Sequence, residues 1–245
     1  CHPLNYALGI AKAALSAGAK IYENSPATSY KVLDDHVRVN TKNGSIKADR
    51  IVLACNGYLE NLEKSLTSKI LPMNNYIVAT KPLDDETVQK INPKDIAFAD
   101  SRFVINYFRM SADKRLLFGG GENYSQELSK NIVPIVTRPL EKIYPFLKGI
   151  KIDYAWGGKL AITMNRLPFF ASLHNEKVIS AQGYSGQGVA LASYSGKIVS
   201  EKITGTGEVF DIMSKIPRPS FPGGRFLRNP SMKIGMLYYS LLDRI

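Results

Sequence analysis

The clearest candidate for chemistry in this sequence is a glycine-rich turn between an apolar run and a helical pattern. Residues 178–180 (VIS) favour a strand, residues 183–188 (GYSGQG) form the turn, and from Val189 apolar residues recur at helical spacing as far as Gly205. A strand, a glycine turn and a helix in this order can present free backbone N–H groups to an anionic ligand. The spacing is G-x-x-G-x-G and not the G-x-G-x-x-G of dinucleotide sites. The turn predicts a cofactor loop, with a tight strand-to-helix connection as the alternative.

A second group of residues could contact a substrate. Tyr107 and Arg109 are two positions apart on an expected strand, so their side chains face the same side. The forked guanidinium of Arg109 suits a carboxylate, although a surface arginine beside a core tyrosine is the alternative. Trp156, which precedes two glycines, could line a pocket for an amine or belong to the core. Tyr184 lies inside the glycine turn, where we expect it to line the active site. Cys55 has no neighbouring base, so a nucleophilic role is not expected.

Composition limits the class of protein. The 245 residues, 44% of them hydrophobic, suffice for one large domain or two small ones. No apolar run approaches the roughly 20 residues of a membrane span, and no signal peptide is visible. Two cysteines and no C-x-x-C favour a cytoplasmic setting without a metal site. The net charge of +11 fits an acidic ligand or nucleic acid, but a lysine-rich solvated surface explains it better. Because the chain begins at Cys1 and enters a helical pattern almost at once, we expect it to be part of a longer protein.

The first 66 residues combine a helix, a hairpin-rich segment and a buried strand. Residues 4–17 favour a helix that Gly18 ends, and residues 20–22 a short strand. Residues 28–49 alternate like a β-meander, with turns at 34–35 and at the Asn-Gly pair 43–44. Residues 50–54 are apolar throughout, as expected inside a parallel sheet. They lead into Cys55, Asn56 and Gly57, where open α/β sheets bind ligands.

The pattern changes after residue 66. Residues 76–80, 103–110, 115–118 and 152–156 favour strands, and 132–144 a helix interrupted or begun near Pro139. Strands this close together, without regular helical crossovers, favour an antiparallel sheet. The α/β pattern returns near residue 178. We therefore predict an α/β (α+β) fold in which a domain at 1–66 and 161–215 is split by a second domain at 67–160, followed by a tail at 216–245.

Several segments in fixed order resemble FAD-dependent oxidoreductases of the D-amino-acid-oxidase type, and most of all the γ-glutamylputrescine oxidase branch. They are HPLNYALGIAKAA, ADRIVLACNGY, LPMNNYIVATKPL, YFRMSADKRLLFGGG, DYAWGGKLAITMNRLPF, AQGYSGQGVALA, and PGGRFLRNP followed by GMLYYSLLD. The family fold is an FAD domain split around a mostly antiparallel substrate domain. In the family a βαβ unit with the G-x-G-x-x-G fingerprint precedes these segments. This chain therefore resembles the C-terminal portion of an oxidase, and the resemblance implies a missing N-terminal segment as its partner.

The resemblance also implies roles for individual residues. Cys55, Asn56 and Gly57 would lie near the pyrophosphate of FAD, and Ala27 near the adenine side. For Asn165 and Arg166, which precede Leu167 and Pro168, two roles stay open: holding the flavin edge or forming a turn. The turn and the start of the helix would line the flavin ring: Gly183, Tyr184, Ser185, Gly186, Gln187, Gly188 and Val189.

Departures from the family pattern bear on substrate and linkage. Related sarcosine oxidases carry histidine at Gln187 and a lysine at Ala190, which argues against sarcosine. Some relatives link FAD through a cysteine where this chain has glycines and Lys159 after Trp156, which implies non-covalent FAD. Because the G-x-G-x-x-G fingerprint is missing, we expect FAD to be weakly held or absent in this fragment. The expected activity is oxidation of the C–N bond of a small primary or secondary amine, γ-glutamylputrescine-like or amino-acid-like, to an imine. The alternatives are an FAD domain in tRNA modification, although nucleic acid is not the expected partner, and a truncated non-catalytic domain.

Overall fold

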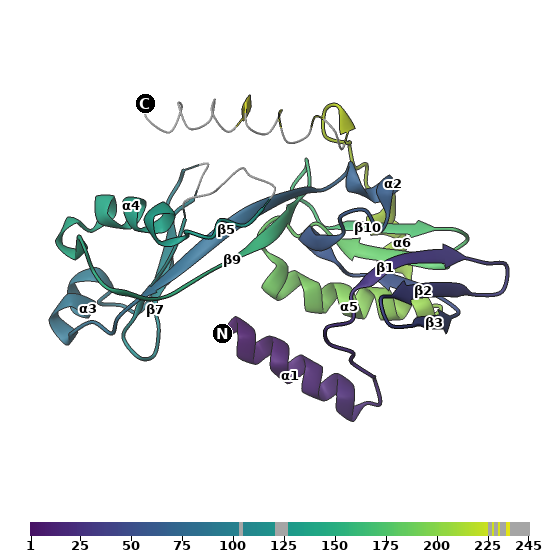
Figure 1. Cartoon of the computed structure of the whole chain (residues 1–245), viewed down its shortest axis with the longest axis horizontal. Coiled ribbons are helices and arrows are strands. Elements are labelled where there is room, and N and C mark those ends of the chain that lie inside the picture. Colours follow the sequence, from purple (N-terminus) through teal and green to yellow (C-terminus); the bar gives the residue numbers. More distant parts are fainter. Residues whose placement is uncertain (103–104, 121–126, 225–226, 228–229, 231–233, 236–245) are drawn as a thin grey trace. The chain divides into compact units, whose positions relative to one another are not determined.

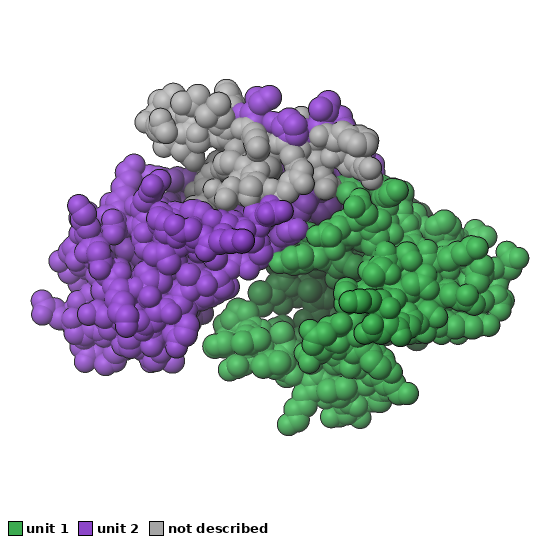
Figure 2. All heavy atoms as spheres, viewed as in Figure 1, with its two compact units in different colours: residues 1–67, 165–218 green, residues 68–164, 219–245 purple. Residues whose placement is uncertain are grey.

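The structure is a computed structural model of the chain, and it describes all residues except 103–104, 121–126, 225–226, 228–229, 231–233 and 236–245. The chain forms two compact units (Figure 2). Unit 1 contains residues 1–67 and 165–218, and unit 2 contains residues 68–164 and 219–245. Each unit is thus built from two separate stretches of sequence.

Unit 1 begins with helix α1 (Pro3–Ser16) and a three-stranded antiparallel meander (Figure 1). The meander consists of β1 (Ala27–Val32), β2 (Val37–Thr41) and β3 (Ser45–Ala48). Asn43 and Gly44 form the turn between β2 and β3, so the predicted hairpin is confirmed. The short strand predicted at residues 20–22 is wrong, because these residues are exposed and pair with no strand of the described chain. Three β-prone residues cannot form a strand unless a neighbouring strand takes up their backbone hydrogen bonds.

The second sheet of unit 1 joins distant parts of the chain. Strand β4 (Ile51–Leu53) pairs in parallel with β11 (Val178–Gln182), which pairs antiparallel with β10 (Phe169–Leu173). Helices α5 (Gly188–Thr204) and α6 (Glu208–Lys215) pack on this sheet. Apolar residues of β10, β11 and both helices make its core: Phe170, Ile179, Ala181, Ile198, Val199 and Phe210. The predicted strand at 50–54 and the helix that ends at Gly205 are confirmed.

Unit 2 is built on a five-stranded antiparallel sheet in the order β6-β7-β8-β5-β9. The strands are β5 (Leu71–Thr80), β6 (Phe98–Ala99), β7 (Tyr107–Met110), β8 (Leu116–Gly119) and β9 (Ile152–Ile162). β5 and β9 are the long pair in Figure 1. The antiparallel sheet predicted for this region is confirmed, whereas residues 103–104 of one predicted strand lie outside the described residues.

One face of the unit 2 sheet is covered by helix α4 (Val133–Ile143), which contains Pro139. Side chains alternate between the faces of a sheet, and the covered face contributes Tyr76, Val78, Leu116 and Phe118 to a core with Val136 and Leu140 of α4. Helix α3 (Asp85–Ile91) adds Ile91 to this core. The residues between these positions therefore project from the opposite face.

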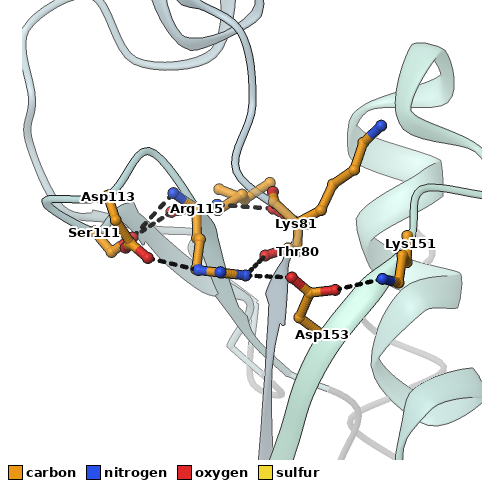
Figure 3. Close-up of polar contacts among 8 residues, drawn as sticks. Thr80, Lys81, Ser111, Asp113, Arg115, Lys151 and Asp153 are labelled. Carbon is orange, nitrogen blue, oxygen red and sulfur yellow. Dashed lines mark hydrogen bonds and ion pairs between the residues drawn. The ribbon is translucent and has the colours of Figure 1, made fainter.

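An ionic cluster ties three strand ends of unit 2 together (Figure 3). Arg115, just before β8, donates to Asp113, Asp153 and the carbonyl of Thr80 at 2.6–2.9 Å. Hydrogen bonds from Ser111 and Arg115 lower the pKa of the Asp113 carboxyl, and the hydrogen bond from Arg115 lowers that of Asp153. The cluster therefore links the end of β5 to the starts of β8 and β9.

Several short elements have no clear signal in the sequence. They are the 3-10 turns η1 (Asn56–Tyr58) and η2 (Pro145–Leu147), helices α2 (Lys64–Thr67), α3 and α6, and strands β6 and β10. Within the described ranges, no helix is long and apolar enough to cross a membrane, and no three metal-binding side chains gather.

Candidate active site

The candidate cofactor loops of unit 1 follow two neighbouring parallel strands. β4 leads into Cys55, Asn56 and Gly57, and β11 leads into the turn that starts at Gly183. The amide N–H of Gly183 donates to the side-chain oxygen of Asn56 at 3.1 Å, which joins the two loops directly. In open α/β sheets, the carboxyl ends of parallel strands are where ligands bind. Residues 127 positions apart in sequence thus form one candidate site.

The turn has the backbone that its glycines make possible. Gly183 and Gly186 have φ values of +75° and +96°, a region that side chains with a Cβ rarely adopt. The amide N–H of Gln187 donates to the carbonyl of Tyr184 at 3.0 Å and closes the turn. The turn therefore delivers the chain from β11 to the start of α5 within five residues.

Tyr184 points into unit 1 and not outward. Its side chain is buried, and its hydroxyl donates to the carbonyl of Ala181 at 3.1 Å. Burial raises the pKa of the Tyr184 hydroxyl, an effect that a hydrogen bond with Ser195 partly offsets. The phenol stays protonated, and its contact with the end of β11 holds the turn against unit 1. Its predicted place beside the flavin stays a prediction.

The N-terminus of α5 is open to a ligand. Among the described residues, no side chain of the N-cap residue Gln187 caps it, and the first amide groups of a helix have no acceptor within the helix itself. A Cβ at Gly188 would meet only the Tyr184 ring among the described residues, at 3.6 Å or more, which is ordinary contact. Gly188 has helical backbone geometry, so no part of the described chain requires glycine there. An uncapped helix start beside a space that a side chain would enter fits an electron-rich cofactor edge.

Gln182, the last residue of β11, adds a signal that sequence reasoning missed. It is fully buried, and within the described chain neither its amide nitrogen nor its amide oxygen has a hydrogen-bond partner. Buried polar groups nearly always have partners, so such an exception requires explanation. No pattern in the sequence reveals it, because a glutamine at a strand end is ordinarily exposed.

The remaining predicted cofactor residues lie in unit 1 but are not all gathered at the loops. Burial raises the pKa of the Cys55 thiol, which makes it a poor nucleophile. Asn165 donates to the carbonyl of Pro217 at 3.2 Å and accepts from the amide of Leu167, so it stabilises a turn. Arg166 is exposed in that turn with φ +61°. Ala27 is exposed at the start of β1, in the meander.

The three predicted substrate residues share the face of the unit 2 sheet that α4 does not cover. Trp156 of β9 pairs with Ile77 of β5, Ile77 with Gly119 of β8, and Gly119 with Tyr107 of β7. Directly paired residues project from the same face, so this row carries Trp156 and Tyr107 together. Arg109 is in the next row along the same face, two residues from Tyr107. Trp156 is 45% exposed and Arg109 is also exposed.

Two residues of this face that sequence reasoning missed are Gly119 and Asn75. The ring of Tyr107 lies across Gly119, and its hydroxyl donates to the side-chain oxygen of Asn75 on β5. Asn75 is also paired with Gly158, on the same face as Trp156. The sequence shows the types of these residues but not the register that brings them together, so no local pattern could reveal them.

Comparison with known proteins identifies the family of this chain. Residues 1–202 match the family described as FAD dependent oxidoreductase (DAO). The chain belongs to this family, so the resemblance seen in the sequence is confirmed. Among individual relatives, it is 39% identical over 243 residues to the "Probable oxidoreductase OrdL" of Rhizobium meliloti (strain 1021), covering 99% of this chain and 56% of that protein. It is 36% identical over 245 residues to the "Gamma-glutamylputrescine oxidoreductase" of Escherichia coli (strain K12), covering 100% of this chain and 57% of that protein.

Solved structures share the fold. Glycine oxidase from Geobacillus kaustophilus superposes with a TM-score of 0.64 at 20% identity, over 81% of this chain and 53% of that one. L-proline dehydrogenase from P. horikoshii superposes with a TM-score of 0.63 at 24% identity, over 80% of this chain and 53% of that one. The chain thus spans a little over half the length of the relatives that it matches.

Proposed function

We propose that the complete protein containing this chain is an FAD-dependent oxidoreductase that oxidises the C–N bond of a primary or secondary amine to an imine. The observation that carries the proposal is the joined pair of loops after β4 and β11, beside the uncapped start of α5. Membership in a family of FAD-dependent oxidoreductases supports FAD as the cofactor. When bound, FAD accepts the hydride from the carbon beside the amine nitrogen.

Unit 1 supplies the residues that would hold the cofactor. The backbone N–H groups of Gly188 and Val189, at the start of α5, would face an electron-rich edge of the ring, with Gly188 leaving room for its approach. Cys55, Asn56 and Gly57 would lie along the pyrophosphate, while Ala27, Asn165 and Arg166 would make peripheral contacts. Since glycines and Lys159, and no cysteine, follow Trp156, we propose non-covalent binding.

Unit 2 supplies the substrate residues. Arg109 is exposed on the open sheet face and would pair with a substrate carboxylate through its forked donors. Tyr107 and Trp156, in one row of the same face, would contact the substrate's amine and carbon chain. Among the names of the relatives, gamma-glutamylputrescine oxidoreductase points to a substrate with both a carboxylate and an amine. We therefore propose a γ-glutamylputrescine-like or amino-acid-like amine.

We also propose that unit 1 is completed by a further polypeptide segment that grips the ADP half of FAD. Helix α1 contains no buried residue, and Leu4, Leu8 and Leu15 are each more than half exposed. Apolar side chains this exposed, side by side on one helix, favour a covering partner. The relatives carry additional length. We propose a cytoplasmic location for the assembled enzyme.

The test compares the 245-residue chain with the full-length protein. We expect the full-length protein to purify with stoichiometric FAD and this chain alone to hold little. Under anaerobic conditions, a carboxylated amine should bleach the visible flavin absorption of the full-length protein. Failure of every amine and amino acid to bleach a fully loaded enzyme would refute the proposed reaction, and a stoichiometric yellow 245-residue chain would refute the need for a further segment.

A further inference from the structure

We propose that Asn75 and Gly119 are positioning residues that hold the Tyr107 ring flat across the open face of unit 2. There the ring would serve as an aromatic floor for the positively charged nitrogen of the amine substrate. The proposal rests on the proposed function and identifies how the substrate surface is built. Its structural basis is one tyrosine side chain held at two points.

The first point is Gly119, the direct cross-strand partner of Tyr107. A Cβ placed on Gly119 would lie 2.1 Å from the ring carbon Cζ of Tyr107 and 2.6 Å from its hydroxyl oxygen. Such distances are far inside van der Waals contact. The ring therefore occupies the volume of the missing side chain, and any other residue at 119 would displace it.

The second point is Asn75, one strand further across the sheet. The Tyr107 hydroxyl donates to the Asn75 side-chain oxygen, so the ring reaches from β7 over β8 to β5. A ring held at its Cβ by the backbone and at its hydroxyl by a hydrogen bond has little freedom in either side-chain torsion. The orientation of Tyr107 is thus set by Asn75 as well as by its own strand.

Because the Tyr107 ring extends across two strands, its hydroxyl lies much nearer to Trp156 than its backbone does. Neighbouring strands are about 4.8 Å apart, so the backbone of Tyr107 lies roughly 14 Å from that of Trp156, three strands away. The Tyr107 hydroxyl, however, ends at β5, the strand next to Trp156. The side chains of Tyr107 and Trp156 therefore lie on either side of strand β5, on the same face of the sheet. A protonated amine within about 6 Å of an aromatic ring face is attracted to it.

A second tyrosine, Tyr76, also packs over a cross-strand glycine, and it differs from Tyr107 in burial. Tyr76 also lies over its cross-strand glycine, Gly157, with a Cβ at Gly157 only 2.5 Å from the ring. The Tyr76 side chain is fully buried in the core under α4, and its hydroxyl oxygen accepts a hydrogen bond from the amide N–H of Ser129. Packing explains Tyr76. Tyr107 is only half-buried and projects from the opposite face, where a ligand can approach it.

The test uses the full-length FAD-loaded enzyme and three variants. Asn75→Leu removes the acceptor at similar volume, and Gly119→Ala displaces the ring. Asn75→Asp keeps an acceptor oxygen. We expect KM for the amine to rise about threefold to tenfold in Asn75→Leu, the scale of one hydrogen bond, with kcat largely retained. Gly119→Ala should raise KM similarly, and Asn75→Asp should restore KM to the wild-type value or below it.

A matched control separates positioning from general damage. Asn92→Leu also removes a hydrogen-bonded asparagine from unit 2, since Asn92 is buried and bonded to the backbone of Ile96. This control should lower the melting temperature and leave KM unchanged. If Asn75→Leu behaves like Asn92→Leu, or if Asn75→Asp fails to restore KM, the positioning role is overturned while amine oxidation stands. A loaded wild-type enzyme that oxidises no amine would instead overturn the proposed function and this inference with it.

Discussion

Replacing Gly188 with alanine should separate a cofactor loop from a plain strand-to-helix connection. Gly188 is the first residue of α5 and has helical backbone geometry, and a Cβ there meets only ordinary contact with Tyr184 among the described residues. Where the backbone permits it, Gly→Ala stabilises a protein by about 0.4–1 kcal/mol through the unfolded state. At this chain length that is a rise of roughly 1–4 °C in melting temperature. The chain itself should therefore tolerate the methyl group.

The cofactor should not tolerate it. If the flavin binds as we propose, the new methyl group would enter the space between the flavin ring and the amide groups of the first turn of α5. A helix N-terminus contributes about 0.3–1 kcal/mol to a nearby anion, and up to about 2 kcal/mol when partly buried. For a two-electron couple about 1.4 kcal/mol corresponds to 30 mV, so we expect the flavin potential to fall by roughly 10–40 mV. The direction is downward because reduction places negative charge on the ring.

The assay combines thermal unfolding of the 245-residue chain with spectroelectrochemical titration of the full-length enzyme. Gly196→Ala is the matched control, because Gly196 lies in the same helix, is exposed, and has no described atom within 4 Å of a new Cβ. It should raise stability and leave the potential unchanged. If Gly188→Ala leaves the potential of the loaded enzyme equal to that of Gly196→Ala, the cofactor-loop assignment is refuted.

Two further predictions concern unit 2. In the full-length enzyme, Arg109→Met should raise KM about tenfold to a hundredfold for amines that carry a carboxylate, and much less for plain amines; equal effects would make Arg109 a structural residue. The hydrogen bond from Arg115 lowers the pKa of Asp153, so this pair stabilises the fold above the ordinary aspartate pKa of about 3.9, and the contribution is lost as the pH falls through the lowered value. Arg115→Met should therefore raise the pH midpoint of acid unfolding followed by circular dichroism, whereas the exposed Arg138→Met should not.

The sequence predicts well the elements whose signal is local. The Asn43-Gly44 turn, the apolar strand at β4 and the helix from Gly188 to its glycine stop were each visible as short patterns, and the structure contains all three. The strand at residues 20–22 was wrong because β-prone residues become a strand only when a partner is available. Strand β10 was missed because its partner β11 lies beyond an intervening turn that gives no clear hairpin signal.

The candidate site is only partly visible in sequence for the same reason. Tyr107 and Arg109 are two residues apart, so their shared face follows from alternation alone. Trp156 joins that face only through three successive strand pairings, and Asn56 reaches Gly183 across 127 positions. Register decides which side chains meet, and it depends on the whole sheet. Family resemblance placed the loops at Asn56 and Gly183 on one cofactor, but it did not associate Trp156 with Tyr107.

The glycines of this chain show how structure adds to a motif. A sequence motif shows only that glycine is present at a position. The structure shows which neighbouring atoms would clash with a Cβ there, and so why glycine is needed. Gly157 is required by the buried ring of Tyr76, which packing explains, and Gly119 by the half-buried ring of Tyr107. Gly188 has neither a neighbouring ring that excludes a Cβ nor a positive φ. Gly196 of the same helix is also not required by the described chain, so the absence of a Cβ matters only through the position of Gly188 at a helix start without a side-chain cap, which suits an electron-rich group. Gly188 therefore carries more weight for a cofactor site than the two glycines of the turn, whose positive φ values already explain them.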